Sequence, residues 1–226
     1  MCNKWTRNLV FVAMLAALVA PVQAAFLVEA HSSGLANGNF SLGGDTTSVS
    51  ASIPSVAYGL TATSSVFGGN GSAFGDTYIY SYTPGTDADN LPIPAGTDLG
   101  NGDLASGLVG GGDGLYNVYI TWPETTNANA AGSKITVTSD GADIVLDPVN
   151  NNTGGTGDPG ASSAWLLIGA DVTLTAGNTY TVSQVANYNS YVSQRSHGVM
   201  WEAVPEPFSV SLLGIGALAL LRRRKG

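Results

Sequence analysis

Short runs of alternating apolar and polar residues recur through the middle of the chain. In residues 116–122, Val118, Ile120 and Trp122 fall on one face of an extended strand, and polar or phenolic side chains fall on the other. Residues 134–138 and 179–184 repeat the alternation, and clusters of Gly, Asn and Asp separate such runs. This pattern predicts an all-β domain over residues 25–203, built as a sandwich or barrel.

The expected strands lie where β-branched or aromatic residues alternate between turn residues. They are residues 48–53, 59–66, 77–82, 115–122, 134–138, 143–146, 164–168, 171–174, 179–184 and 198–203. Residues 139–142 and 175–179 are expected to form turns between neighbouring strands. A segment of about 180 residues is long enough for one domain with a substantial core.

The first 24 residues have the features of a secretory signal peptide with a helical apolar segment. Lys4 and Arg7 form a basic start, and residues 9–20 form an apolar stretch. Small residues then lead to Ala24 and Ala25, between which we expect cleavage. The chain is therefore expected to be exported.

The last 23 residues form a second targeting segment. Val204, Pro205, Glu206 and Pro207 precede the apolar residues 208–221. A basic cluster, which includes Arg222, Arg223 and Arg224, ends the chain. The fourteen apolar residues would form a helix of roughly 21 Å, short of the roughly 20 residues that span a bilayer comfortably. Since positive charge resists translocation, the basic end is expected to stay in the cytoplasm and the body outside.

This tail resembles the PEP-CTERM sorting signal of Gram-negative bacteria, because a Pro-Glu-Pro motif, a short transmembrane helix and an arginine cluster occur in that order. The resemblance covers residues 204–226. It implies an exosortase, a membrane-embedded cysteine protease, as a partner, with transient insertion in the inner membrane. It also implies delivery to the cell surface or exopolysaccharide matrix. The alternative is an ordinary C-terminal anchor.

The charge and the cysteine content of the chain exclude several classes of partner and site. Between Ala25 and Val204 there are two basic and fifteen acidic residues, a net charge of −13. Such a surface repels phosphate backbones, so nucleic acid is not an expected partner. The only cysteine, Cys2, lies in the signal segment, which excludes disulfides and cysteine nucleophiles from the mature chain.

A second resemblance covers residues 60–203. Residues 114–123 are similar to the central strand of golvesin-type modules, also called xanthan-lyase carbohydrate-binding-like modules. The runs at 165–169, 174–177, 179–182 and 198–202 follow in the same order. The resemblance implies a single jelly-roll-like β-sandwich and an extracellular polysaccharide as partner.

Aromatic rings are the candidate sugar-binding groups, because sugars present apolar C–H faces to flat rings. Tyr119 opposes the expected core face of its strand, and Trp165 can face either side. Tyr188 and Tyr191 lie in an Asn-rich stretch typical of a sugar-binding loop. The alternating Tyr78, Tyr80 and Tyr82 form either part of the core or an exposed platform, and the core is favoured. Trp122 is likewise expected in the core.

Acidic loops suggest calcium as an optional ligand. Asp87 and Asp89, and then Asp98 and Asp103, place carboxylates at short spacing on a Gly-rich backbone. Calcium takes six to eight such oxygen ligands. The spacing is not that of an EF-hand, and Asp is also favoured in turns for its own backbone hydrogen bonds.

Catalytic motifs are weak in this sequence. His31 and His197 have no paired-ligand spacing, and no Gly-x-Ser-x-Gly turn occurs. A glycosidase would need only two carboxylates at a suitable separation. We therefore expect a non-catalytic surface or matrix protein that binds polysaccharide. The alternatives are a structural or adhesive surface protein without a glycan site, and a carbohydrate-active enzyme.

Overall fold

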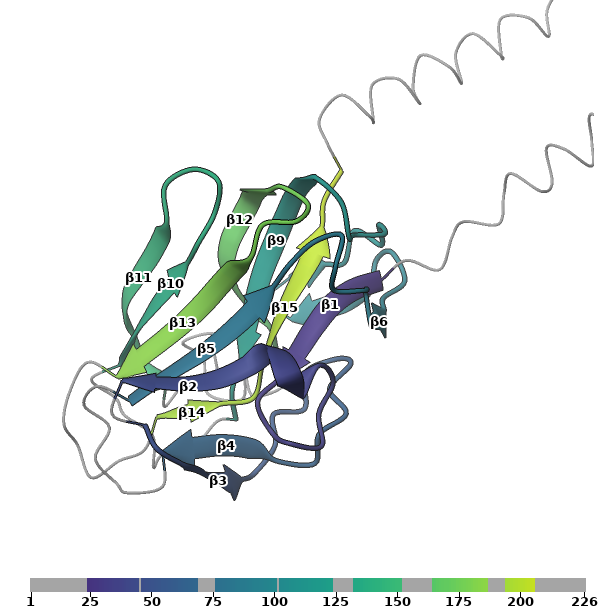
Figure 1. Ribbon diagram of the computed structural model, residues 1–226. Helices are drawn as coiled ribbons and strands as arrows, with labels where there is room; N and C mark the ends of the chain where they lie inside the picture. The colour runs from purple at the N-terminus through teal and green to yellow at the C-terminus, as the bar shows by residue number, and fades with distance from the viewer. Residues whose placement is uncertain are drawn as a thin grey trace, which may run out of the picture.

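The computed structural model describes residues 24–44, 46–68, 76–100, 102–123, 132–151, 164–186 and 194–205. These residues form antiparallel sheets, which confirms the all-β prediction (Figure 1). The first sheet has the order β12 (Leu166–Leu174), β9 (Gly114–Thr121), β15 (Gly198–Ala203), β1 (Ala24–Glu29) and β6 (Leu91–Pro92). The second has the order β11 (Ile144–Val149), β10 (Ser133–Val137), β13 (Tyr180–Ala186), β5 (Asp76–Tyr82) and β2 (Phe40–Gly44).

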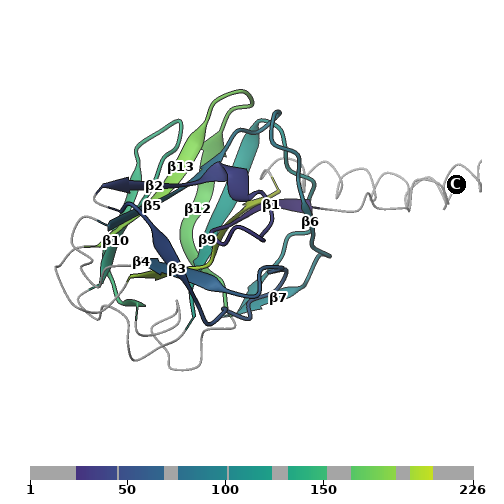
Figure 2. The same ribbon diagram turned by 60° about the horizontal axis from the view of Figure 1, so that its bottom comes forward.

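Smaller elements complete the fold. A three-stranded sheet has the order β14 (Arg195–Ser196), β4 (Ser65–Gly68) and β3 (Val49–Ser52). It lies across the end of the sandwich that comes forward in Figure 2. The strands β7 (Asp98–Gly100) and β8 (Asp103–Leu104) pair with each other, and the 3-10 turn η1 (Asn37–Asn39) precedes β2.

Buried side chains from both large sheets fill the space between them. Tyr78, Tyr80 and Tyr82 alternate along β5 and are all fully buried. The ring of Phe26, from β1, stacks on that of Tyr82 with 4.7 Å between centroids. Trp122 is also fully buried in this cluster. The core interpretation of the tyrosine stripe and of Trp122 is therefore confirmed.

The first sheet is buried on its outer face as well. There Leu27, Tyr119 and Met200 belong to a second apolar cluster. Leu91 and Leu99, from the segment that contains β6 to β8, cover them. Both faces of the central strands are thus apolar, and alternation no longer separates inside from outside.

Most predicted strands occur within a residue or two of their expected bounds, with two corrections. Residues 59–66 do not form one strand, because β4 begins only at Ser65. Residues 164–168 and 171–174 do not form two strands. From Leu166 onwards they belong to the single strand β12, whose register shifts on either side of Gly169 and whose Asp171 has a φ of 51°. Both irregularities are bulge-like, and a bulge lets one strand continue through an interrupted pattern.

The two ends of the described chain lie at the same end of the sandwich. Because β1 and β15 are antiparallel, with Phe26 opposite Trp201 and Glu29 opposite Gly198, the start of β1 lies beside the end of β15. Ala24 and Ala25 pair with β6, and Ala25 is buried. Cleavage between them would place the new N-terminus inside β1. Among the described residues no helix is long and apolar enough to cross a membrane.

Candidate functional site

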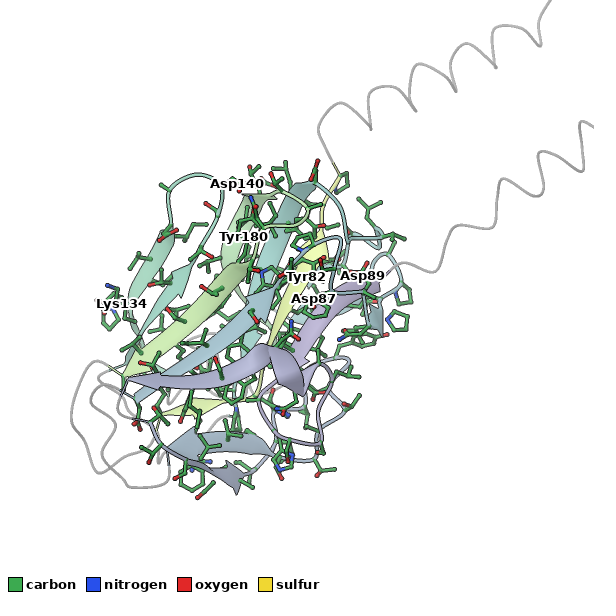
Figure 3. All side chains as sticks on the ribbon, in the orientation of Figure 1. Tyr82, Asp87, Asp89, Lys134, Asp140 and Tyr180 are labelled. Atoms are coloured by element: carbon green, nitrogen blue, oxygen red, sulfur yellow. The ribbon has the colours of Figure 1, made fainter. Side chains whose placement is uncertain are left out.

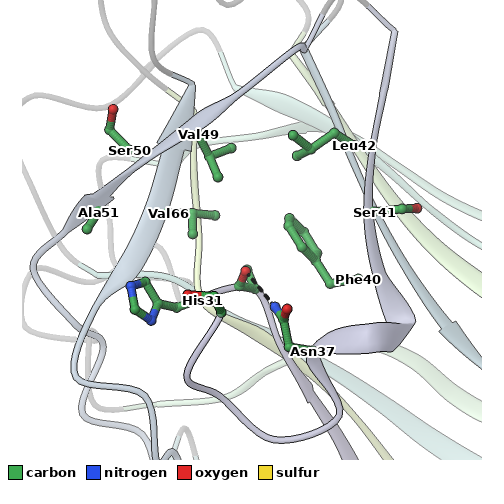
Figure 4. A pocket seen from close by; sticks show the side chains of 11 residues that line it. His31, Asn37, Phe40, Ser41, Leu42, Val49, Ser50, Ala51 and Val66 are labelled. Atoms are coloured by element: carbon green, nitrogen blue, oxygen red, sulfur yellow. Dashed lines mark hydrogen bonds between the residues drawn. The ribbon is translucent and has the colours of Figure 1, made fainter.

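A pocket of about 620 Å³ lies between β2 and the small sheet (Figure 4). Volumes of 300–1,000 Å³ are typical of ligand sites. Phe40 and Leu42 form the wall on β2, and Val49 and Val66 form the facing wall on β3 and β4. Since β2 and β3 are each the last strand of their sheet, the pocket sits at the open rim of the sandwich.

Phe40 provides the phenyl ring of the described pocket lining. Its ring lies 5.1 Å from that of Tyr80 and 6.1 Å from that of Tyr78, measured between centroids. These two buried tyrosines hold the ring from the core side. The phenyl ring therefore presents a fixed apolar surface that a ligand can stack on without ordering a mobile side chain.

Polar groups lie next to these apolar walls. The Asn37 amide donates its N–H groups to the carbonyl oxygens of Glu29, at 3.2 Å, and Ala30, at 3.0 Å, which leaves the amide oxygen toward the pocket (Figure 4). The His31 ring accepts a 3.3 Å hydrogen bond from the Ser33 backbone N–H at Nδ1, so a neutral ring carries its proton on Nε2. The lining also includes Ser32, Ser41 and Ser50. The Ser41 hydroxyl points away from Phe40 and Leu42 (Figure 4), and Ser50 lies on the opposite face of β3 from Val49. The Asn37 amide, the His31 imidazole and the Ser32 hydroxyl are therefore the side-chain groups that can donate to and accept from a hydroxyl-rich ligand.

The Glu29 carboxylate holds the loops beside the pocket. It is fully buried and accepts backbone N–H groups from Leu35 at 2.7 Å, Thr61 at 3.0 Å and Ala62 at 2.8 Å, and the Thr61 hydroxyl at 2.5 Å. Gly34 packs so closely that a Cβ there would lie 2.3 Å from the Glu29 Cβ. The loop that carries His31 and the loop after β3 are therefore tied to the end of β1.

His197 completes this buried polar group. Its Nδ1 accepts the Ser55 backbone N–H at 2.9 Å, and its Nε2 lies 3.7 Å from Oε1 of Glu29. Burial lowers the pKa of His197 from its ordinary value of 6.5 to about 4, although the charge of Glu29 acts in the opposite direction. The imidazole is therefore neutral near pH 7.

Two aromatic residues predicted as sugar contacts are buried instead. Tyr119 is 2% exposed and Trp165 is fully buried. The segment 91–105 covers the sheet face on which Tyr119 lies, and the Trp165 indole N–H donates to the Tyr58 carbonyl at 3.0 Å. Neither ring is a surface platform. Tyr188 and Tyr191 lie outside the described residues.

Three of the four aspartates predicted as calcium ligands accept hydrogen bonds from backbone N–H groups. The Asp87 carboxylate accepts the Thr83 backbone N–H at 2.7 Å, and the Asp98 carboxylate accepts that of Gly100 at 2.8 Å. The Asp89 carboxylate accepts the Gly110 N–H at 2.8 Å, and burial raises its pKa (Figure 3). Asp103 lies in β8. Within the described ranges no group of three or more acidic, His or Cys side chains could hold a metal ion.

The sorting motif falls largely outside the described residues. Val204 donates its backbone N–H to the Leu115 carbonyl at 2.9 Å, and Pro205 is the last residue described. Glu206, Pro207 and the Arg222–Arg224 cluster follow beyond it. The motif therefore begins within two residues of the end of β15.

The pocket could not be predicted from the sequence. The run Phe40-Ser41-Leu42 alternates as a strand does, but it is short and ends in two glycines. His31 and Asn37 precede it in a loop without a recognisable motif. Only the pairing of β2 with β5 shows that this run is a sheet edge facing another apolar strand.

The fold and pocket define this chain as a β-sandwich with a small polar-rimmed site at its edge. No protein-family model matches the chain, and no curated protein matches its sequence. Among solved structures, it is similar to a xanthan lyase from Paenibacillus, with 17% identity and a TM-score of 0.51 over 82% of this chain. The match spans 14% of the length of that lyase, so the likeness concerns the fold of one part of it.

Proposed function

We propose that this chain is an exported, non-catalytic protein of the cell surface or exopolysaccharide matrix and that it binds polysaccharide in the pocket between β2 and the small sheet. The observation that carries the proposal is the pocket itself. A fixed phenyl ring forms part of its wall, and the Asn37 amide, the His31 imidazole and the Ser32 hydroxyl lie around it.

This arrangement matches the chemistry of a sugar ring. One face of a pyranose presents C–H groups, which pack against an aromatic ring such as Phe40, while its edge presents hydroxyls. Each hydroxyl both donates and accepts a hydrogen bond. The Asn37 amide oxygen can accept, and the protonated Nε2 of a neutral His31 can donate.

The fold comparison supports a polysaccharide ligand by analogy alone. The similar structure is named for an enzyme of xanthan, and its matched part has the same kind of β-sandwich. A shared fold does not carry function by itself. The proposal therefore depends on the residues of the pocket, with the fold as an accompanying argument.

The positions of the two chain ends suit a protein that is processed at both of them. We propose removal of residues 1–24 by signal peptidase and recognition of Pro205-Glu206-Pro207 by an exosortase-type protease of the inner membrane. Both processing sites would lie at one end of the sandwich, because β1 starts where β15 ends. Ala30 and His31, which line the pocket, follow the other end of β1. The strands β3 and β4 also lie at that other end (Figure 1), so while the tail is inserted this end would be the one farther from the membrane.

The test replaces the ring at position 40. Phe40→Leu keeps apolar volume but removes the flat surface, whereas Phe40→Tyr keeps the ring. Protein purified from cells would be run by affinity electrophoresis through gels containing the exopolysaccharide of the same cells. We expect Phe40→Leu to lose most of the retardation and Phe40→Tyr to retain it.

A control variant must distinguish the loss of the Phe40 ring from a general disturbance of the fold. Val145 is 52% exposed on β11, at the opposite edge of the same sheet, so Val145→Ala should leave binding unchanged. Thermal unfolding would check that every variant is folded. If folded Phe40→Leu is retarded as strongly as the wild type, the pocket is not the glycan site, and a structural or adhesive role without a glycan site would take its place.

A further inference from the structure

We infer that the pocket takes a neutral, hydroxyl-rich polysaccharide rather than one that carries carboxylate, sulfate or phosphate groups. This inference rests on the proposed function, since it names the ligand class of the same pocket. Three features favour a neutral ligand: the uncharged lining, the position of the basic side chains, and the net negative charge of the body.

Among the residues that the structure describes, the lining contains no Lys, Arg, Asp or Glu. It consists of small and apolar side chains, three serines, one asparagine and one histidine: Ala30, His31, Ser32, Asn37, Phe40, Ser41, Leu42, Val49, Ser50, Ala51 and Val66. An acidic sugar is normally held by Arg or Lys, because a charged group that loses water must be paired. Nothing in the described lining can pair with a carboxylate in that way, whereas the Asn37 amide and the His31 imidazole suit a hydroxyl.

Arg195 is the basic residue nearest to this region in the fold, but it lies on the other face of the small sheet. Its guanidinium donates to the Ser52 hydroxyl and lies 5.7 Å from the centroid of the Phe67 ring. Phe67 is adjacent to Val66 on β4, so the two side chains point to opposite faces. Because Val66 lines the pocket, Arg195 stands behind the pocket wall.

The other basic residue that the structure describes is Lys134. It lies on β10, whereas the pocket is next to β2 at the far edge of the same sheet (Figure 3). With two basic against fifteen acidic residues between Ala25 and Val204, the body repels an anionic polymer before contact. Salt weakens that repulsion beyond a Debye length of about 8 Å, yet it adds no cation to the pocket.

The experiment separates neutral from acidic glycans of the native matrix. Exopolysaccharide from the same cells would be divided by anion exchange into a neutral and an acidic fraction, each cast in gels at 0.15 M salt. We expect the wild type to be retarded by the neutral fraction, with an apparent Kd at least tenfold tighter than for the acidic one, and Phe40→Leu to lose this retardation.

A charge introduced at the pocket should reverse the preference. Ala51 is exposed on β3 and lines the pocket, so Ala51→Lys should gain retardation by the acidic fraction. Val145→Lys makes the same change in net charge on β11 and should not. An equal gain in both variants would mean that net charge, rather than the lining, sets the preference, which would overturn the inference.

The outcomes also separate this inference from the proposed function. Retardation by the acidic fraction that equals or exceeds that by the neutral one, and that Phe40→Leu abolishes, would overturn neutral recognition and leave the glycan site in place. Retardation by neither fraction, or retardation that Phe40→Leu does not change, would remove the glycan site itself.

Discussion

The neutral state of His197 should make folding stability depend on pH in a defined window. The ring is fully buried between the Ser55 backbone N–H and the Glu29 carboxylate, and burial lowers its pKa to about 4. In the unfolded chain the same ring titrates near 6.5. The other histidine near enough to act on it is His31, whose charge would lower the pKa further.

The sign and the size follow from linkage. Between pH 6.5 and about 4 the unfolded chain binds a proton that the folded chain does not, so stability falls as the pH drops through this window and is fully present above it. A difference of roughly 2.5 pH units at about 1.36 kcal/mol per unit gives a loss of about 3 kcal/mol. This is a large share of the roughly 5–15 kcal/mol that stabilises most domains.

The perturbation that tests this is His197→Asn, whose amide oxygen can still accept the Ser55 N–H but does not titrate. Urea unfolding at half-unit steps from pH 8 to pH 4 would give the free energy of unfolding of both proteins. We expect the variant to be less stable at pH 8, because of the smaller side chain, and the gap to close by about 3 kcal/mol towards pH 4. Groups that do not interact with His197 titrate equally in both proteins, so they cancel in the difference. A gap that stays constant across the window would refute the buried neutral imidazole.

Two further predictions concern residues that the sequence singles out. Trp165→Ala should lower the free energy of unfolding by about 3–5 kcal/mol, as expected for a buried indole, whereas Tyr119→Phe should leave retardation in the exopolysaccharide gels unchanged. If a stably folded Tyr119→Phe variant lost its retardation in the gels, Tyr119 would be part of the glycan site. Glu206→Ala should leave export intact and prevent removal of the tail, so a mass spectrum of surface protein would end at Gly226. Normal-sized mature protein from this variant would argue against recognition by an exosortase-type protease.

The strands of the two-layer core could be predicted because their pattern is local. In β5 and β13 buried residues alternate with partly exposed ones along the whole strand, so the pattern is visible within a few neighbouring residues. The strand β1 escaped prediction because it is apolar on both faces and follows a signal segment that is also apolar. Alternation detects a strand only when one face meets water.

Exposure of aromatic residues could not be predicted for a related reason. Tyr119 opposes Val118 and Ile120 on its strand, which in a two-layer sandwich would place its ring at the surface. The cover comes from Leu91 and Leu99, twenty or more positions earlier in the chain and in a segment rich in Gly and Asp. The residues next to Tyr119 in the sequence do not indicate that contact. The burial of its ring therefore could not be predicted from the alternation of its strand.

The pocket depends on still more distant contacts. Val49 and Val66 meet Phe40 and Leu42 only because β3 and β4 form a separate small sheet, and that sheet is completed by β14 from near the end of the described chain. Each of these strands is too short to bury its apolar face by itself. Part of that face therefore stays open opposite β2, and a site at this rim is a product of sheet topology rather than of any motif in the sequence.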